Sequence, residues 1–466
     1  MKIHFCLIIS LLFTINAFSQ VAVPASPPKP SKSSLPRTMM SAYPPKWAAK
    51  ANIYEVNLRQ YTPGGTIKEF ITHLDRLSKM GVEVLWFMPI QPIGIKNRKG
   101  SLGSYYSISD YLMVNPEFGT MAEWIELVDI AHSKGMKVIL DWVANHTSFD
   151  HAWTKVHPEY YTKDDKGNII PPVADWTDVA DLNYDNKEMR KAMIEALRFW
   201  VRATNIDGYR CDVADMMPLD FWQEARRELE KVRPGLFMLA ESEKPEFHDK
   251  AFDMTYTWSL FHPMNDIADG KKTAKAIDEY LLTQNSWPKN AHRMYFTQNH
   301  DENSWQGTEY EKMGAAAPAF AVLTFGLKGM PLIYSGQEAA NKKRLRFFDK
   351  DTIQWNNYPL ADFYGKLLNL KRNEPALESG ENGGAFIKVS DNKNENVYAF
   401  MRMKEKSKVM FVFNLSAKPQ KIKLDAPDIA GIATDVFATT PQDIAFKSSY
   451  SVTLQPWQYQ VFRYKN

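Results

Sequence analysis

Charged and polar side chains in this sequence gather at the ends of short apolar runs, where they could carry out acid–base and nucleophilic chemistry. In chain order, these positions hold Asp141, His146, Arg210, Asp212, Glu241, His300 and Asp301. A single carboxylate at the end of an apolar run is most simply a helix cap or a surface charge. Four carboxylates at four such ends instead predict a shared cleft, in which one group attacks a neutral polar substrate such as a sugar and another protonates it.

Two of these carboxylates differ in their neighbours along the chain. Arg210 stands two residues before Asp212, so on a strand both side chains point to the same face, and the guanidinium would keep Asp212 ionised as a nucleophile. Glu241 has no basic neighbour before Lys244, which favours a raised pKa and the role of general acid. Glu243 shares a face with Glu241 but lies further along the loop, and it is the alternative acid.

The apolar runs alternate with amphipathic segments. The runs cover residues 53–56, 82–89, 136–142, 206–212, 236–241, 293–297 and 330–336. Residues 67–80 and 121–134 repeat apolar side chains at helical spacing and are each followed by glycine, which predicts two helices. Short apolar runs between helices are typical of a parallel sheet buried on both faces. We therefore expect an α/β fold, a (β/α)8 TIM barrel over residues 47–377, whose strand ends share one face.

Two segments depart from this alternation. Residues 147–185 contain a turn at 163–168 and no helical period, so we expect a short loop domain inserted after the third strand. Residues 378–466 show a period of two around turn residues, which predicts a C-terminal antiparallel β-sandwich domain.

The N-terminal segment predicts export to the periplasm or the cell exterior. Residues 1–19 combine Lys2, an apolar run and small residues near the end, which is the layout of a signal peptide, and the run is shorter than a membrane span. Residues 20–46 are rich in Pro, Ser and Lys and indicate a linker. Cleavage would remove Cys6 and leave Cys211 alone, so the exported protein would have no internal disulfide and no membrane span.

Composition excludes several classes of protein. The 466 residues carry 57 Lys and Arg against 54 Asp and Glu, and this formal charge of +3 offers no basic field for nucleic acid. With 44% hydrophobic and 24% charged residues, the chain is globular rather than disordered. The aromatic share of 13% supplies core side chains and also flat surfaces for sugar rings.

Several segments resemble the signature regions of the α-amylase superfamily of glycoside hydrolases. The segments that match in order and approximate spacing are DWVANH at 141–146, GYRCD at 208–212, LAES at 239–242 and FTQNHD at 296–301. Further similar segments are YYSISDY at 105–111, VADLN at 179–183 and PLIYSGQE at 331–338. The resemblance covers about residues 52–377 and implies a barrel enzyme acting on starch, glycogen or maltodextrins.

Carried over by position, the resemblance implies a catalytic role for three carboxylates. Asp212 would be the nucleophile that forms a covalent glycosyl-enzyme, and Glu241 would act first as the acid and then as the base. Asp301 would hold sugar hydroxyls and favour the distorted ring. The covalent intermediate implies that the anomeric configuration is retained.

The resemblance also implies contacts around these carboxylates. Tyr106 would stack under the sugar whose bond is cut, and His146 and His300 would bond its hydroxyls. Arg210 would orient Asp212, and Asp141 would be a structural member of the site. A plain core position remains the alternative for Tyr106 and for each histidine.

Two positions imply a structural calcium ion. Asn145 and Asp181 match family positions that often bind calcium between the barrel and the inserted loop, and calcium prefers several oxygen ligands. The alternative is that Asn145 caps a turn and that Asp181 is a surface residue.

One departure from the family pattern keeps the mode of action open. Many α-amylases carry a Lys-His pair three and four residues after the nucleophile, where this chain has Asp215 and Met216. We expect cleavage of internal α-1,4-glucosidic bonds. The alternatives are an exo-acting α-glucosidase, or a cyclomaltodextrinase or neopullulanase-like enzyme with transfer activity. A non-catalytic glucan-binding protein is a remote alternative, because Asp212, Glu241 and Asp301 are all present.

Overall fold

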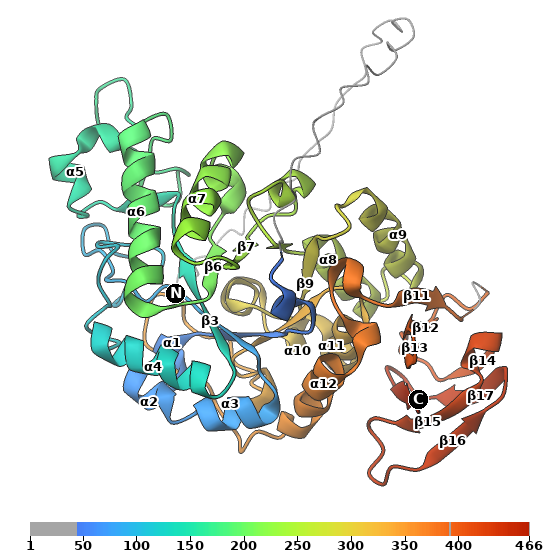
Figure 1. Ribbon diagram of the computed structural model, residues 1–466. Coiled ribbons are helices and arrows are strands. Elements are labelled where there is room, and N and C mark those ends of the chain that lie inside the picture. Colours follow the sequence, from blue (N-terminus) through green and yellow to red (C-terminus); the bar gives the residue numbers. More distant parts are fainter. Residues whose placement is uncertain (1–43, 391–392, 466) are drawn as a thin grey trace, which may run out of the picture. The chain divides into compact units, whose positions relative to one another are not determined.

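The computed structural model describes residues 44–390 and 393–465. The predicted signal peptide, Cys6 and the predicted linker as far as residue 43 lie outside these residues. Eight parallel strands close into a barrel in the order β1-β10-β9-β8-β7-β6-β3-β2 (Figure 1). They are β1 (Ile53–Val56), β2 (Val84–Phe87), β3 (Lys137–Trp142), β6 (Gly208–Cys211), β7 (Phe237–Ala240), β8 (Met254–Thr255), β9 (His292–Tyr295) and β10 (Met330–Tyr334). The predicted TIM barrel is therefore confirmed.

Helices surround the barrel strands (Figure 1). They are α1 (Leu58–Tyr61), α2 (Ile67–Ile71), α3 (Leu74–Met80), α4 (Met121–Ser133), α6 (Lys187–Thr204), α7 (Leu219–Val232), α8 (Trp258–Ala268), α9 (Lys275–Thr283), α10 (Glu309–Met313), α11 (Ala317–Gly326) and α12 (Ala361–Asn373). Across the described ranges, no helix combines the length and the apolar character needed to cross a bilayer.

One of the two predicted helices is divided. Residues 67–80 form α2 and α3 rather than a single helix: α2 ends at Ile71, and the hydroxyl of the following residue, Thr72, donates to the carbonyl of Glu69 at 2.7 Å. This bond competes with helix continuation at a β-branched residue. The other prediction holds: α4 begins with a capping box of Thr120 and Glu123 and ends one residue before Lys134.

The segment inserted after β3 contains two short strands. β4 (His146–Ser148) pairs antiparallel with β5 (Val179–Asp181), and between them lie α5 (Trp153–Val156) and a 3₁₀ turn, Pro158–Tyr160. Most of this segment is irregular, as the missing helical period predicts.

Antiparallel sheets follow the barrel. A six-stranded sheet has the order β11-β12-β13-β18-β15-β16, and β14 pairs with β17 in a second sheet. The strands are β11 (Ala385–Lys388), β12 (Val397–Lys404), β13 (Ser407–Asn414), β14 (Gln420–Asp425), β15 (Gly431–Asp435), β16 (Asp443–Phe446), β17 (Ser449–Leu454) and β18 (Tyr459–Tyr464). Side chains of both sheets share one apolar core, which includes Met401, Val412, Ile422 and Leu454. The predicted C-terminal β-sandwich is confirmed.

Candidate active site

Asp212 and Glu241 lie side by side at the ends of two neighbouring strands. Cys211 of β6 pairs in register with Ala240 of β7, and each carboxylate is the next residue along its strand. The backbone N–H of Glu241 donates to the carbonyl of Cys211 at 3.0 Å, which continues the ladder past the strand end. The barrel register therefore sets the two carboxylates at the same level.

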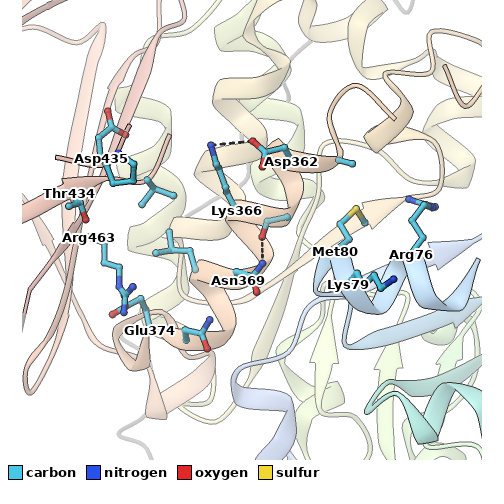
Figure 2. A pocket seen from close by; sticks show the side chains of 16 residues that line it. Arg76, Lys79, Met80, Asp362, Lys366, Asn369, Glu374, Thr434, Asp435 and Arg463 are labelled. Atoms are coloured by element: carbon cyan, nitrogen blue, oxygen red, sulfur yellow. Dashed lines mark hydrogen bonds and ion pairs between the residues drawn. The ribbon is translucent and has the colours of Figure 1, made fainter. Parts of the chain in front are cut away.

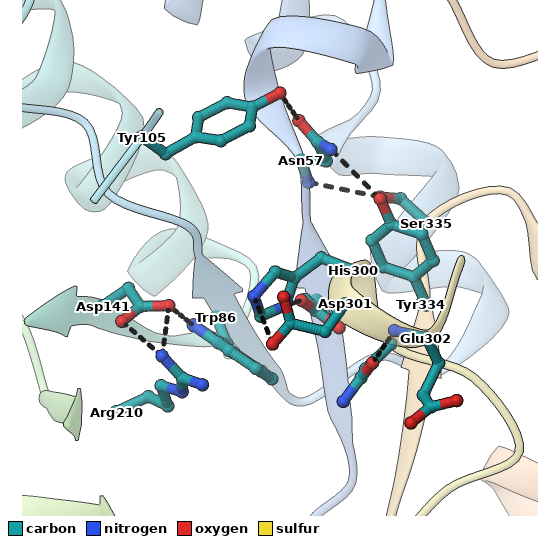
Figure 3. Close-up of polar contacts among 12 residues, drawn as sticks. Asn57, Trp86, Tyr105, Asp141, Arg210, His300, Asp301, Glu302, Tyr334 and Ser335 are labelled. Atoms are coloured by element: carbon teal, nitrogen blue, oxygen red, sulfur yellow. Dashed lines mark hydrogen bonds and ion pairs between the residues drawn. The ribbon is translucent and has the colours of Figure 1, made fainter. Parts of the chain in front are cut away.

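Arg210 contacts three carboxylates at once. Its Nη1 donates to Asp212 Oδ1 at 2.9 Å and to Asp141 Oδ1 at 3.0 Å, and its Nη2 lies 2.8 Å from Glu241 Oε2. Figure 3 shows Arg210 against Asp141. Glu241 has no basic neighbour in the local sequence before Lys244, but in the fold Arg210 of the adjacent strand supplies one.

Asp141 is a buried support for this group. Besides Arg210, its Oδ2 accepts from Trp86 Nε1 at 3.1 Å and from the hydroxyl of Tyr106 at 3.2 Å. The carboxylate is fully buried, and these donors replace the water it has lost. This position fits the structural role expected for Asp141.

His300 links Asp301 to a carboxylate that the sequence analysis missed. Its Nδ1 lies 2.5 Å from Glu55 Oε1, and its Nε2 lies 2.6 Å from the Tyr106 hydroxyl and 3.4 Å from Asp301 Oδ2. Figure 3 shows His300 beside Asp301. Glu55 is a charged residue inside the otherwise apolar strand β1, and a buried charge of this kind needs a partner, which was the available signal.

Burial raises the pKa values of the carboxyl groups in this cluster. It raises the pKa values of both Asp212 and Glu241, against the opposing charge of Arg210. Burial also raises the pKa of Asp141, against the charge of Arg210, and that of Glu55, chiefly against the charge and hydrogen bond of His300. A single guanidinium cannot hold every neighbouring carboxyl group ionised, so the cluster can retain a proton, as acid catalysis requires.

The two site histidines differ in charge. Burial lowers the pKa of His146 to about 4, so this ring is neutral at neutral pH. Burial also disfavours the charged form of His300, but the carboxylates of Asp301 and Glu55 outweigh it and raise the pKa to about 9. His300 is therefore a cation within the carboxylate cluster.

The turn after Asp212 is strained and directs a backbone N–H group toward the Glu241 carboxylate. Val213 adopts φ +36°, a left-handed conformation that β-branched residues rarely take. Its backbone N–H donates to Glu241 Oε2 at 2.7 Å. Such strain persists only where the surrounding structure enforces it, and here it fixes the orientation of one carboxylate beside the other.

A cavity of about 450 Å³ opens above these groups. Five residues expected in the site line this cavity: Tyr106, His146, Asp212, Glu241 and Asp301. Val213 lines it as well. Trp176, Trp305, Phe347 and Phe348 add aromatic surface to the walls. By contrast, Trp142 is fully buried and Trp153 packs against the core, so neither belongs to the lining. A carboxylate cluster under aromatic walls suits a sugar substrate.

Of the two expected calcium ligands, Asp181 lies on β5, and Asn145 directly precedes the neighbouring strand β4. Asp181 pairs in register with His146, and the N–H of Leu182 donates to the carbonyl of Asn145 at 3.1 Å. Asn145 Nδ2 lies 3.2 Å from His146 Nδ1, which leaves the amide oxygen for another partner. Within residues 44–390 and 393–465, no three His, Cys, Asp or Glu side chains form a group that could hold a metal ion. A calcium site here would depend on backbone carbonyls besides Asn145 and Asp181, and it stays a prediction.

Another cavity, of about 690 Å³, lies away from this cluster. Figure 2 shows its lining, with Arg76 and Lys79 of α3, Lys366 of α12, and Asp435 and Arg463 of the C-terminal sheet. Among the described residues, no aromatic side chain lines it, and Lys366 is paired with Asp362 at 3.1 Å. It lacks the converging carboxylates of the first cavity.

Comparison with protein families finds two matches along the chain. Residues 33–171 and 173–364 match the family described as "Alpha amylase, catalytic domain". Residues 387–461 match "Maltogenic Amylase, C-terminal domain". The two matches cover the barrel and most of the antiparallel sheets.

Individual relatives are similar over most of this chain. It is 27% identical over 402 residues to the α-amylase MalA of Haloarcula japonica, a match that spans 82% of this chain and 58% of that protein. It is 24% identical to a cyclomaltodextrinase of a Bacillus species, over 75% of this chain and 66% of that protein. The chain thus spans less than two thirds of the length of both relatives.

Solved structures are similar over a larger share. An α-amylase from Lactobacillus plantarum superposes with a TM-score of 0.80 at 30% identity, covering 90% of this chain and 99% of that one. A maltogenic α-amylase from Thermotoga neapolitana, termed noncanonic, gives a TM-score of 0.81 at 29% identity and covers 89% and 99%. Both similarities extend through the barrel into the C-terminal domain.

Proposed function

The chain belongs to the α-amylase family of glycoside hydrolases, and on this basis we propose that it hydrolyses α-1,4-glucosidic bonds in starch, glycogen or maltodextrins with retention of configuration. The observation that carries the proposal is the contact of one guanidinium, that of Arg210, with both Asp212 and Glu241 at the base of an aromatic cavity. Two carboxyl groups with separate duties are what glycoside cleavage requires.

In the first step, the Asp212 carboxylate attacks the anomeric carbon. The bond from that carbon to the glycosidic oxygen breaks, and the oxygen leaves with its electron pair and takes the proton of Glu241. A covalent ester joins the sugar to Asp212. In the second step, Glu241 accepts a proton from water, the water oxygen attacks the anomeric carbon, and the Asp212 carboxylate is released.

The remaining residues hold the sugar in place. Tyr106 offers its ring as a platform, fixed by stacking on His300 with 5.6 Å between ring centroids. The cationic His300 and the cavity-lining Asp301 are suited to bond hydroxyls next to the anomeric carbon. His146, neutral and in the same lining, offers a further hydroxyl contact.

Two modes of action fit this chemistry. Cleavage of internal bonds is the mode expected from the sequence. A second candidate is a cyclomaltodextrinase or maltogenic mode that releases short products, and the match of the C-terminal domain to maltogenic amylases favours it. Relatives named as a cyclomaltodextrinase and a maltogenic α-amylase also support this second candidate. The exo-acting α-glucosidase mode is the remaining alternative, and the products released would distinguish it from the other two modes.

A product time course tests the proposal. Purified protein is incubated with amylose, pullulan and maltooligosaccharides, and the anomer released first is identified by NMR. We expect hydrolysis with the α-anomer appearing first. Initial release of the β-anomer would refute the covalent mechanism, and glucan binding without any turnover would favour the non-catalytic alternative.

Export and calcium belong to the same proposal. We propose that residues 1–19 direct the chain out of the cytoplasm, because a glucan polymer is too large to import, and that a structural calcium ion joins Asn145 and Asp181. Sequencing the N-terminus of the secreted protein and metal analysis of the purified protein test the two statements.

A further inference from the structure

The loop after β2, residues 94–104, is tied to the inserted segment. Lys99 Nζ lies 3.1 Å from Asp178 Oδ1 and donates to the carbonyl of Asp175 at 2.8 Å. The backbone N–H of Ile95 donates to Asp150 Oδ2 at 2.7 Å. Lys99, Asp175 and Asp178 all line the cavity above the carboxylates. These contacts make the loop and the inserted segment one continuous wall.

The same loop is tied on its other side to the segment after β10. The N–H of Leu102 donates to the carbonyl of Phe348 at 2.9 Å, and the N–H of Ser101 donates to Asp349 Oδ1 at 2.8 Å. Arg59, which is buried, donates to the carbonyls of Gly103 at 3.0 Å and of Phe347 at 3.1 Å and so joins both segments from below. Residues 94–104 therefore bridge two loops of the barrel face.

The barrel order places this wall opposite the acid. In the closed sheet, β7, which presents Glu241, is four strands from β1 in either direction. The bridge runs between the loops that follow β2 and β10, the two neighbours of β1. The leaving part of a glucan must lie on the side of the group that protonates it, so the wall faces the part of the chain that stays on the enzyme.

From these contacts we infer that residues 94–104, tied down by Lys99, close the cavity on the side of the retained sugar, so that it accepts the non-reducing end of an α-1,4-glucan rather than its interior. This inference rests on the proposed function and, within the second mode of action, selects the maltogenic form, because a cyclic glucan has no non-reducing end. A chain bound through its interior would have to extend past Lys99, Asp178 and Phe348. Lys99 is then a specificity-determining residue that sets the length of the released product.

The Lys99–Asp178 pair is suited to such a role because its aspartate is buried while its lysine side chain remains partly in water. The Lys99 side chain is 32% exposed and that of Asp178 is 6% exposed. Hydrogen bonds from Ile95, Ser101 and Leu102 would still hold the loop, so loss of the pair should open the wall at Lys99 without unfolding the barrel. Ser107 holds the backbone of Asp178 in place independently, through a bond of 3.0 Å from its hydroxyl to the carbonyl.

The test compares maltoheptaose with a maltoheptaoside whose non-reducing end carries a blocking group. We expect the wild-type enzyme to hydrolyse the blocked substrate at least about tenfold more slowly, since a closed site rejects the added group. In the variants Lys99→Met and Asp178→Asn, the ratio of blocked to unblocked rates should rise about threefold or more, and longer products should appear. The ratio is taken within one preparation, so it does not depend on the folded fraction.

Lys155→Met is the matched control, because Lys155 is an exposed lysine of α5 in the same inserted segment and does not line the cavity. It should leave the ratio unchanged. Equal hydrolysis of blocked and unblocked substrates by the wild type would overturn the closed site while leaving the proposed function intact. An unchanged ratio in both Lys99→Met and Asp178→Asn would overturn the role of the pair. Failure to hydrolyse either substrate would instead reject the proposed function.

Discussion

Replacing Glu241 with glutamine tests the division of labour between the two central carboxyl groups. Arg210 Nη2 and the N–H of Val213 both contact the same oxygen, Oε2, at 2.8 and 2.7 Å. A glutamine carbonyl can accept both contacts, so the side chain should keep its place. The variant loses only the exchangeable proton that a carboxyl group carries on its other oxygen, Oε1.

The expected loss of activity equals the rate enhancement that a correctly placed general acid provides. General acid–base catalysis contributes about 10²- to 10⁴-fold, which is about 2.7 to 5.4 kcal/mol at 1.36 kcal/mol for each tenfold. We expect kcat/KM on maltotriose to fall within this range. With α-maltosyl fluoride, whose leaving group needs no proton, formation of the glycosyl-enzyme should fall far less than it does with maltotriose. The intermediate should then accumulate, because the base for the second step is missing.

The assay follows fluoride release in rapid-mixing experiments and detects the intermediate by intact mass spectrometry. Glu243→Gln is the matched control, since Glu243 is engaged with Ser259 Oγ at 2.6 Å and with Arg293 at 3.0 Å and does not line the cavity. It should retain turnover close to that of the wild type. Equal losses on the fluoride and on maltotriose, or a larger loss in Glu243→Gln than in Glu241→Gln, would refute the assignment of the acid.

Three further outcomes follow from the site. Asp212→Asn should lower kcat on the order of 10⁴- to 10⁶-fold and give no covalent adduct with a 2-fluoro sugar in mass spectrometry. An adduct on another residue would show that Asp212 is not the nucleophile. The pKa of His300, raised to about 9 from its ordinary 6.5, means that its contribution to stability is complete below pH 6.5 and is lost as pH rises through 9. Urea unfolding between pH 6 and 9.5 should show this loss, of the order of 3 kcal/mol, in the wild type, and a profile equally steep in His300→Gln would contradict it. If calcium joins Asn145 and Asp181, a chelator should lower Tm in the wild type and not in Asp181→Ala, whereas an equal shift in both proteins would place the ion elsewhere.

The sequence predicted the barrel because its strands are buried on both faces and therefore read as apolar runs. Seven of the eight strands were found in this way. The eighth, β8, has two residues, Met254 and Thr255, and follows Asp253, a buried partner of Arg226, so that no apolar run marks it. A strand this short is defined by the neighbours with which it pairs rather than by its own pattern.

The sequence predicted which residues form the site but not which contacts they make with one another. Asp212, Glu241 and Asp301 line one cavity, as their places at strand ends indicated. Contacts between strands, such as that of Arg210 with Glu241, depend on register and cannot be read from neighbours along the chain. Lys99 gave no signal at all, because its partners Asp175 and Asp178 are distant in sequence and belong to an irregular segment.

The guanidinium that Asp212 and Glu241 share makes their ionisation reciprocal. In the proposed cycle, formation of the ester abolishes the negative charge of Asp212, which lies 2.9 Å from Arg210. The positive charge of Arg210 is then no longer partly neutralised by Asp212, so it attracts the Glu241 carboxylate more strongly. The negative charge of Asp212, which favoured a proton on Glu241, is gone as well. The affinity of Glu241 for a proton therefore falls once it has protonated the leaving group, so its carboxylate stays ionised and can serve as the base that takes a proton from water. Arg210 thus couples the change of Glu241 from acid to base to the formation of the covalent ester on Asp212.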